Sequence, residues 1–110
     1  MKNRLILLFA ITMIIGSCSK DDNDDGSPGT NEVWMQNTSF KPSTITVAAG
    51  TTIKWTNKEG STHTVTSNSN VFNSGNLTED KTFSFKFDSA GTYAYHCTLH
   101  SGMNGTVVVN

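Results

Sequence analysis

One stretch near the C-terminal end carries the clearest pattern in this sequence: Tyr93-Ala94-Tyr95-His96-Cys97-Thr98-Leu99-His100-Ser101-Gly102-Met103. Its first half alternates, so the two tyrosines and Cys97 share one face of a predicted strand, whereas His96 lies on the other face. Its second half has the spacing Cys-x-x-His-x-x-Met. If the tyrosine face is inward, Cys97 points into the protein where the strand ends. His100 and Met103 then lie on the loop that follows.

The residue types in this loop indicate a metal site. A thiolate, an imidazole and a thioether without a carboxylate favour copper over Mg, Ca or Mn, and the two-residue spacers suit a single ion. A second imidazole would complete a His₂Cys set with a weak methionine, which suits copper in both oxidation states. A lone histidine on a strand is usually structural, but His63 follows a strand-like pattern upstream and can complete this set. The pattern predicts one copper ion at His63, Cys97, His100 and Met103.

His96 directly precedes the thiol but is expected to be a surface residue and not a ligand, because the alternation turns it outward. Because His96 is next to the predicted metal-binding thiol, we also consider it as an additional path for electrons to or from the copper ion, or as a docking point for a partner protein. His96→Ala should then change electron-exchange rates with at least one partner.

The pattern around this stretch is all-β from residue 31 onward. Short segments rich in Val, Ile, Thr and aromatic residues predict strands at 32–38, 44–48, 51–56, 62–67, 82–87, 91–97 and 105–109. Gly- and Pro-containing turns separate them, and 68–80 has the weakest pattern and is expected to be a loop. About seven to eight short strands in one domain predict a small Greek-key β-sandwich. The expected core residues are Trp34, Phe40, Trp55, Phe72, Phe83, Phe85, Phe87, Tyr93 and Tyr95.

The N-terminal segment is predicted to be a targeting signal over residues 1–17. Lys2 and Arg4 precede a short apolar run, which is shorter than the roughly 20 residues of a membrane-spanning helix. The run ends in Ile15-Gly16-Ser17-Cys18, which resembles the lipobox of bacterial lipoproteins. This resemblance implies cleavage before Cys18, lipidation of Cys18 and anchoring in the bacterial cell envelope, either periplasmic or surface-exposed. Ordinary signal-peptide cleavage is the alternative.

The domain boundaries follow from composition. Residues 18–30 are expected to form a lipidated and acidic flexible linker, because four Asp lie between Lys20 and Asp25 and no apolar residue follows Cys18 in this segment. Residues 31–110 form the predicted domain. A Cys18–Cys97 disulfide is the other use of the two cysteines, and it is disfavoured because no packing residues surround Cys18.

The charge of the chain excludes one class of function. The formal net charge is −1 and no basic stripe is present, so a nucleic-acid partner is not expected. From residue 31 onward the Lys residues balance the Asp and Glu residues. A domain without net charge exerts little long-range electrostatic attraction on a partner protein. We therefore expect partner proteins to dock on an exposed apolar surface around Leu99, His100 and Met103.

Three runs of the sequence resemble the cupredoxins, most closely the plastocyanin and amicyanin group. They are Phe40 to Asn57, His63-Thr64-Val65, and Gly91 through Met103 to Val109, and Phe72-Asn73-Ser74-Gly75 also fits. The resemblance covers the whole domain, and the short ligand loop is most similar to amicyanin. It implies three equatorial ligands, His63, Cys97 and His100, and a long axial ligand, Met103. One departure is Thr64, because an Asn often follows the upstream histidine in the family and supports the thiolate.

The leading functional hypothesis is a lipid-anchored, monomeric electron carrier that cycles between Cu(II) and Cu(I) and is not an enzyme. In the family the downstream histidine is partly exposed and passes the electron, a role that falls to His100. The alternative is a copper-binding or copper-delivery lipoprotein that uses the same ligands. Reversible blue colour would favour the carrier, and loss of copper on reduction would favour delivery.

Overall fold

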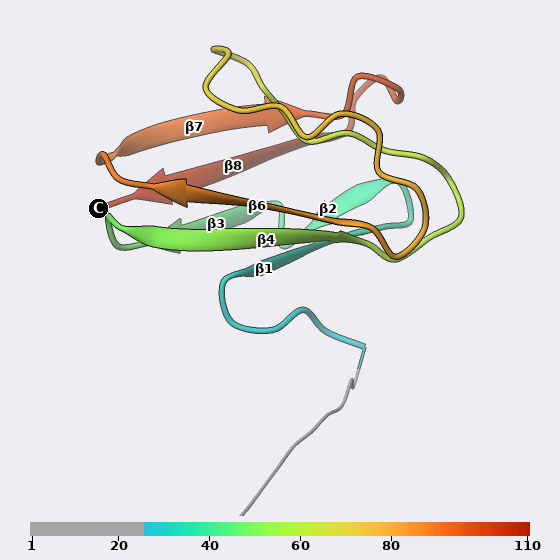
Figure 1. The fold of residues 1–110 in the computed structure, drawn as a ribbon, viewed down its shortest axis with the longest axis horizontal. Coiled ribbons are helices and arrows are strands. Elements are labelled where there is room, and N and C mark those ends of the chain that lie inside the picture. The colour runs from blue at the N-terminus through green and yellow to red at the C-terminus, as the bar shows by residue number, and fades with distance from the viewer. Residues whose placement is uncertain (1–25) are drawn as a thin grey trace, which may run out of the picture.

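The computed structural model describes residues 26–110 as an all-β sandwich of two four-stranded sheets (Figure 1). The strands are β1 (Glu32–Gln36), β2 (Ser39–Lys41), β3 (Thr44–Val47), β4 (Thr51–Asn57), β5 (Thr66–Ser67), β6 (Thr82–Phe87), β7 (Gly91–His96) and β8 (Asn104–Val109). The predicted fold class and strand number are therefore confirmed. The predicted signal segment, Cys18 and the first part of the linker lie outside the described residues. From residue 26 onward no helix is long and apolar enough to cross a membrane.

Each sheet combines parallel and antiparallel pairs. One sheet has the order β2-β1-β4-β6 and the other the order β3-β8-β7-β5. The pairs β1–β4 and β3–β8 are parallel, and all the others are antiparallel. The β7–β8 hairpin matters most for the site, because its last paired residues are His96 and Asn104. This register leaves residues 97–103 as the loop that joins the two strands.

The core between the sheets combines aliphatic side chains with a cluster of aromatic rings. Trp55 on β4 is fully buried at its centre, and its ring centroid lies 5.5 Å from that of Tyr95 and 5.7 Å from those of Phe72 and Phe83. The alternation of β6 points its three phenylalanines inward, as the sequence predicts. Aromatic rings at these separations add attraction beyond their buried area.

Trp34 is the one expected core aromatic that lies elsewhere. Its neighbours Val33 and Met35 are both fully buried in the core cluster, so the pleat of β1 turns the indole to the outer face of the sheet. There Trp34 is only 7% exposed, and the ammonium group of Lys58 lies 4.8 Å from the centre of its ring. Trp34 is therefore buried outside the core cluster between the sheets.

Two strand predictions differ from the structure by more than one residue at an end, and β2 was not predicted. The predicted strand 32–38 ends at Gln36, because Asn37 and Thr38 have φ values of 57° and 54° and form a turn into β2, which the sequence pattern did not show. The predicted strand 62–67 is limited to Thr66–Ser67, so His63 does not lie in a strand. Residues 68–80 contain no named strand, which agrees with the predicted loop.

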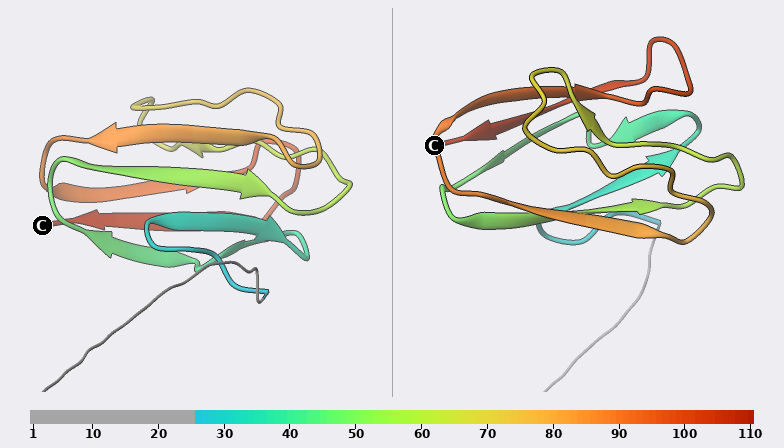
Figure 2. Two further views of the ribbon diagram at one scale, coloured as in Figure 1. Left: turned by 60° about the horizontal axis from the view of Figure 1, so that its bottom comes forward. Right: turned by 45° about the horizontal axis from the view of Figure 1, so that its top comes forward.

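The connections that carry the predicted ligands gather at one end of the sandwich. The loop between β7 and β8 and the segment between β4 and β5 both lie at the end opposite the C-terminus (Figures 1 and 2). The turn between β1 and β2 lies toward the same end (Figure 1). The fold therefore brings together three connections that are far apart in the sequence.

Candidate metal centre

Three predicted ligands meet at this end of the sandwich. One donor atom from each of His63, Cys97 and His100 lies within 4.8 Å of the other two. The Sγ atom of Cys97 is 3.7 Å from Nδ1 of His63 and 3.5 Å from Nδ1 of His100. Donors that each lie about 2 Å from a shared ion are at most about 4 Å apart, so the two distances from Sγ of Cys97 suit a single metal ion.

The ligand loop, defined as Cys97–Met103, is closed by its own main chain. The N–H of Cys97 donates to the carbonyl of Met103 at 3.0 Å, and the N–H of Met103 donates to the carbonyl of His100 at 3.2 Å. Gly102 has a φ of 85°, which a glycine adopts without strain where the loop turns back toward β8. Cys97 and Met103 are 4% and 3% exposed. The loop thus buries both sulfur-containing side chains and pairs their residues through the main chain.

The histidine segment, defined as Asn57–Thr64, holds His63 without a strand. His63 pairs with Leu77 in an isolated bridge, with main-chain hydrogen bonds of 3.0 and 2.7 Å. Asn57 is fully buried and donates from Nδ2 to the carbonyls of Ser61 and Leu77. Its Oδ1 also accepts the N–H of Glu59 at 3.0 Å. An isolated main-chain bridge and side-chain hydrogen bonds therefore replace the strand pairing that the sequence pattern predicted here.

The outer nitrogen of His63 contacts a carboxylate. Oε2 of Glu59 lies 2.6 Å from Nε2 of His63, which is fully buried. Partial burial acts to raise the pKa of Glu59, but the N–H of Thr38, the contact with His63 and the N–H of Asn37 outweigh it and hold this pKa below its usual value. The Glu59 carboxylate is therefore charged near neutral pH.

Thr64, the departure noted from the sequence, contacts both ligand-bearing segments. Its N–H points at Sγ of Cys97 at 3.4 Å, and its hydroxyl accepts the N–H of Thr98 at 2.9 Å. The same hydroxyl lies 3.0 Å from that of Thr66 and 3.1 Å from that of Thr98. A threonine at this position thus links the ligand loop to the histidine segment through hydroxyl and main-chain bonds.

The donor set fits copper on chemical grounds. It combines the sulfur of Cys97 with Nδ1 of His63 and Nδ1 of His100, and the Glu59 carboxylate contacts the far nitrogen of His63. Thiolate and thioether donors favour copper, whereas Mg, Ca and Mn prefer oxygen. Carboxylates beyond the donors orient ligating histidines in metal sites. Glu59 and Asn57 were not identified from the sequence, although Glu59 stands only four residues before His63.

The structure also tests the predicted exposure of the residues around the metal centre. His96 points away from the cluster, with Nδ1 2.6 Å from Oδ1 of Asn68, which agrees with its expected outward position. Leu99 is 50% exposed and His100 is half-buried. The expectation that Met103 forms part of the exposed apolar surface is wrong, because its side chain is buried where the loop closes onto β8.

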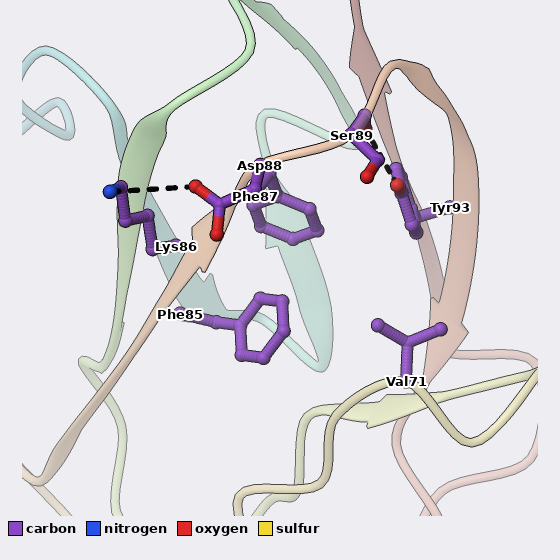
Figure 3. A pocket seen from close by; sticks show the side chains of 7 residues that line it. All are labelled: Val71, Phe85, Lys86, Phe87, Asp88, Ser89 and Tyr93. Atoms are coloured by element: carbon purple, nitrogen blue, oxygen red, sulfur yellow. Dashed lines mark hydrogen bonds and ion pairs between the residues drawn. The ribbon is translucent and has the colours of Figure 1, made fainter.

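A surface groove elsewhere on the sandwich is separate from this centre. It has a volume of about 200 Å³ and is lined among others by Val71, Phe85 and Tyr93. Figure 3 shows these side chains around it, between β6 and the start of β7. Because β7 begins at the groove and ends beside Cys97, the two features lie toward opposite ends of the strand.

The fold and the donor set define a small all-β domain with a place for one metal ion bound by sulfur and nitrogen. The family model of the cupredoxin-like domain matches residues 5–109. The chain therefore belongs to the cupredoxin family.

Individual relatives agree with this assignment. A plastocyanin of Scenedesmus fuscus is 36% identical over 83 residues, which cover 64% of this chain and 85% of that protein. Amicyanin-alpha of Methylorubrum extorquens is 31% identical over 111 residues, covering 92% of this chain and 89% of that protein.

Solved structures show the same fold. The Cu(I) form of an amicyanin variant superposes with a TM-score of 0.69 at 30% identity, covering 81% of this chain and 87% of that one. A purple cupredoxin from Nitrosopumilus maritimus superposes with a TM-score of 0.68 at 26% identity, covering 72% of this chain and 98% of that one.

Proposed function

We propose that this cupredoxin is a blue-copper electron carrier with His63, Cys97, His100 and Met103 as the copper ligands. The observation that carries the proposal is the position of the buried Cys97 Sγ, 3.7 and 3.5 Å from the two histidine Nδ1 atoms. A bound copper ion would supply the Cu(II)/Cu(I) couple. Relatives named plastocyanin and amicyanin, and the Cu(I) amicyanin structure, support the choice of metal.

The surrounding residues suit a carrier because they hold the donors in one arrangement. The thiolate accepts the N–H of Thr64, and a fixed N–H near sulfur is one of the features that tune the potential of such sites. His63 is fully buried, whereas His100 is half-buried beside the exposed Leu99. His100 is therefore the proposed route for the electron, and the surface around Leu99 is the proposed contact for a redox partner.

All four proposed donors come from the protein, so no position is kept open for a substrate. Catalytic metal sites typically leave one position for water or substrate. We therefore assign the chain to electron transfer between partner proteins and not to catalysis, and we propose that it acts as a monomer.

The optical spectrum of the copper-loaded protein tests this proposal. The wild type should be intensely blue when oxidised, and Cys97→Ser should be colourless because the thiolate produces the colour. His63→Ala should also lose the colour, whereas the matched variant His96→Ala should keep it, because His96 points away from the cluster. Blue colour that survives in Cys97→Ser contradicts the ligand assignment.

The alternative function, copper delivery, uses the same residues and is distinguished by the fate of the metal. A carrier should pass through repeated oxidation and reduction without releasing copper. A delivery protein should release the metal to a chelator after reduction. The burial of Cys97 and Met103 favours the carrier, because a delivery site has to expose its donors to a partner.

We further propose that Cys18 is lipidated and tethers the domain to the cell envelope through residues 18–30. The support is the sequence Ile15-Gly16-Ser17-Cys18 after an apolar run. Labelled palmitate should be incorporated into the wild type and should be absent from Cys18→Ala, which should also leave the membrane fraction. Equal labelling of both proteins would contradict the tether.

A further inference from the structure

The carboxylate of Glu59 and the thiol of Cys97 contact opposite sides of the same imidazole ring. Oε2 of Glu59 is 2.6 Å from Nε2 of His63, and Sγ of Cys97 is 3.7 Å from Nδ1 of that ring. The ring is fully buried, and Glu59 is half-buried. One nitrogen of His63 therefore has a fixed polar partner that is not a candidate metal ligand.

Main-chain groups from another part of the protein fix the carboxylate in turn. The N–H of Asn37 donates to Oε1 of Glu59 at 3.1 Å, and the N–H of Thr38 donates to Oε2 at 2.9 Å. The N–H of Glu59 itself donates to Oδ1 of Asn57. Both carboxylate oxygens and the main chain of Glu59 are thus held by partners outside the ligand loop.

We propose that Glu59 is a positioning residue of the metal centre, which holds His63 through Nε2 and couples it to the Asn37–Thr38 turn. The proposal rests on the function proposed above and deepens it. An ionised carboxylate only accepts hydrogen bonds, so its contact places a ring proton on Nε2 and leaves Nδ1, which faces Sγ of Cys97, as the nitrogen that would ligate copper. Such outer carboxylates fix the tautomer and orientation of a ligating histidine and make it a stronger donor.

The two histidines of the site differ in this respect. No hydrogen bond described within residues 26–110 involves Nε2 of His100, so Glu59 gives His63 a restraint that the other imidazole lacks. Asn37 and Thr38 are exposed, whereas His63 is fully buried. The chain of hydrogen bonds therefore links a surface turn to one buried ligand.

The metal-free protein provides the first test. In the wild type, ¹⁵N chemical shifts should show His63 as the Nε2–H tautomer, and the amide protons of Asn37 and Thr38 should exchange slowly. Glu59→Ala and the near-isosteric Glu59→Gln should mix the tautomers and speed exchange at both amides. The matched variant Glu79→Gln should leave both unchanged, because Glu79 is exposed.

The copper-loaded protein provides the second test. Loss of the Glu59 carboxylate should weaken copper binding about 10- to 100-fold, as is typical for outer-shell partners. It should also raise the reduction potential, since removing a negative charge disfavours Cu(II) more than Cu(I), and Glu79→Gln should shift the potential less.

Glu59 variants that lower only the unfolding free energy, with tautomer, amide exchange and potential unchanged, would overturn the proposal. Failure of the wild type to bind copper would instead overturn the proposed function, while the metal-free test would still decide the role of Glu59.

Discussion

The ligand loop and the histidine segment meet at one buried thiol but are held in different ways. The ligand loop spans seven residues, closes by its own main-chain hydrogen bonds and follows Tyr95, whose ring packs on Trp55 and Phe40. The histidine segment contributes one donor and depends on polar contacts with distant residues, among them Leu77 and Thr38. The ligand loop is thus held by contacts within itself and by the aromatic rings that pack beneath it. The histidine segment is held by hydrogen bonds to residues far away in the sequence.

This difference predicts which substitutions each region tolerates. Loss of a buried polar side chain leaves its former partners without hydrogen bonds, which is costly. The histidine segment should therefore be sensitive to polar truncation, and the ligand loop to changes in the rings beneath it. Five substitutions test this comparison.

Asn57→Ala should have the largest effect on stability. It removes three hydrogen bonds of a fully buried side chain, and we expect the free energy of unfolding to fall by about 2–4 kcal/mol. Urea unfolding of the metal-free protein measures this, with the exposed Asn76→Ala as the control. A loss below about 1 kcal/mol would mean that Asn57 does not hold the histidine segment.

Tyr95, beneath the ligand loop, should produce a loss of stability at alkaline pH. Burial raises its pKa to about 12 from the ordinary value of 10.0. The unfolded chain therefore loses the phenolic proton first, so stability present below pH 10 should fall by about 2–3 kcal/mol between pH 10 and pH 12.

Tyr95→Phe should remove this pH dependence, as measured by urea unfolding at a series of pH values. Tyr93→Phe is the control, because the Tyr93 hydroxyl donates to the carbonyl of Ser89 and is not enclosed. If the unfolding free energy of Tyr95→Phe still falls between pH 10 and pH 12 as in the wild type, groups other than Tyr95 cause the alkaline loss of stability.

Gly105→Ala should destabilise the base of the ligand loop. A Cβ atom at Gly105 would clash with the ring of Tyr95, which is fully buried. Such overpacking costs about 1–3 kcal/mol, which thermal or urea unfolding would detect. Gly60→Ala in the histidine segment is a matched control, because a Cβ there meets no atom within 4 Å. Equal stability of the two variants would contradict the close packing of Tyr95 on β8.

Thr64→Val should weaken the link between the two regions without removing the metal site. It leaves the N–H of Thr98 without its hydroxyl acceptor, which should cost about 1 kcal/mol of unfolding free energy. The main-chain N–H of Thr64 still points at the thiol, so the copper-loaded variant should stay blue. Thr64→Ser keeps the hydroxyl and should be close to wild type. A Val variant as stable as the Ser variant would show that the hydroxyl network adds nothing.

Leu99→Ala should have the smallest effect on stability, within about 0.5 kcal/mol, because the side chain is half exposed and lies outside the core. If Leu99 forms part of the partner surface, electron exchange between copies of the protein should slow. Stopped-flow or NMR exchange rates measure this, with the exposed Val71→Ala on the side groove as the control. Equal rates in both variants would place the docking surface elsewhere.

Much of the fold was predictable because its signals are local. The alternation of β6 and β7 placed Phe87 and Tyr95 inward, and both are buried in the structure. The position of the ligand loop was predictable for the same reason, since Cys97, His100 and Met103 lie within seven residues on one hairpin connection. The strand pattern was misleading at His63, where an isolated bridge replaces continuous strand pairing. It was also misleading at Asn37 and Thr38, where positive φ values end the strand.

The sequence by itself determined the class of fold and the spacing of Cys97, His100 and Met103 on one hairpin connection, because alternation and spacing act between near neighbours. Only the tertiary structure decided what surrounds His63. Asn37 and Glu59 are 22 residues apart, and Asn57 and Leu77 are 20 apart, so no local pattern reports their contacts. The burial of Met103 likewise depends on how the loop folds back onto β8. Hydrogen bonds between distant segments depend on how the whole chain packs, and they complete the polar surroundings of the thiol.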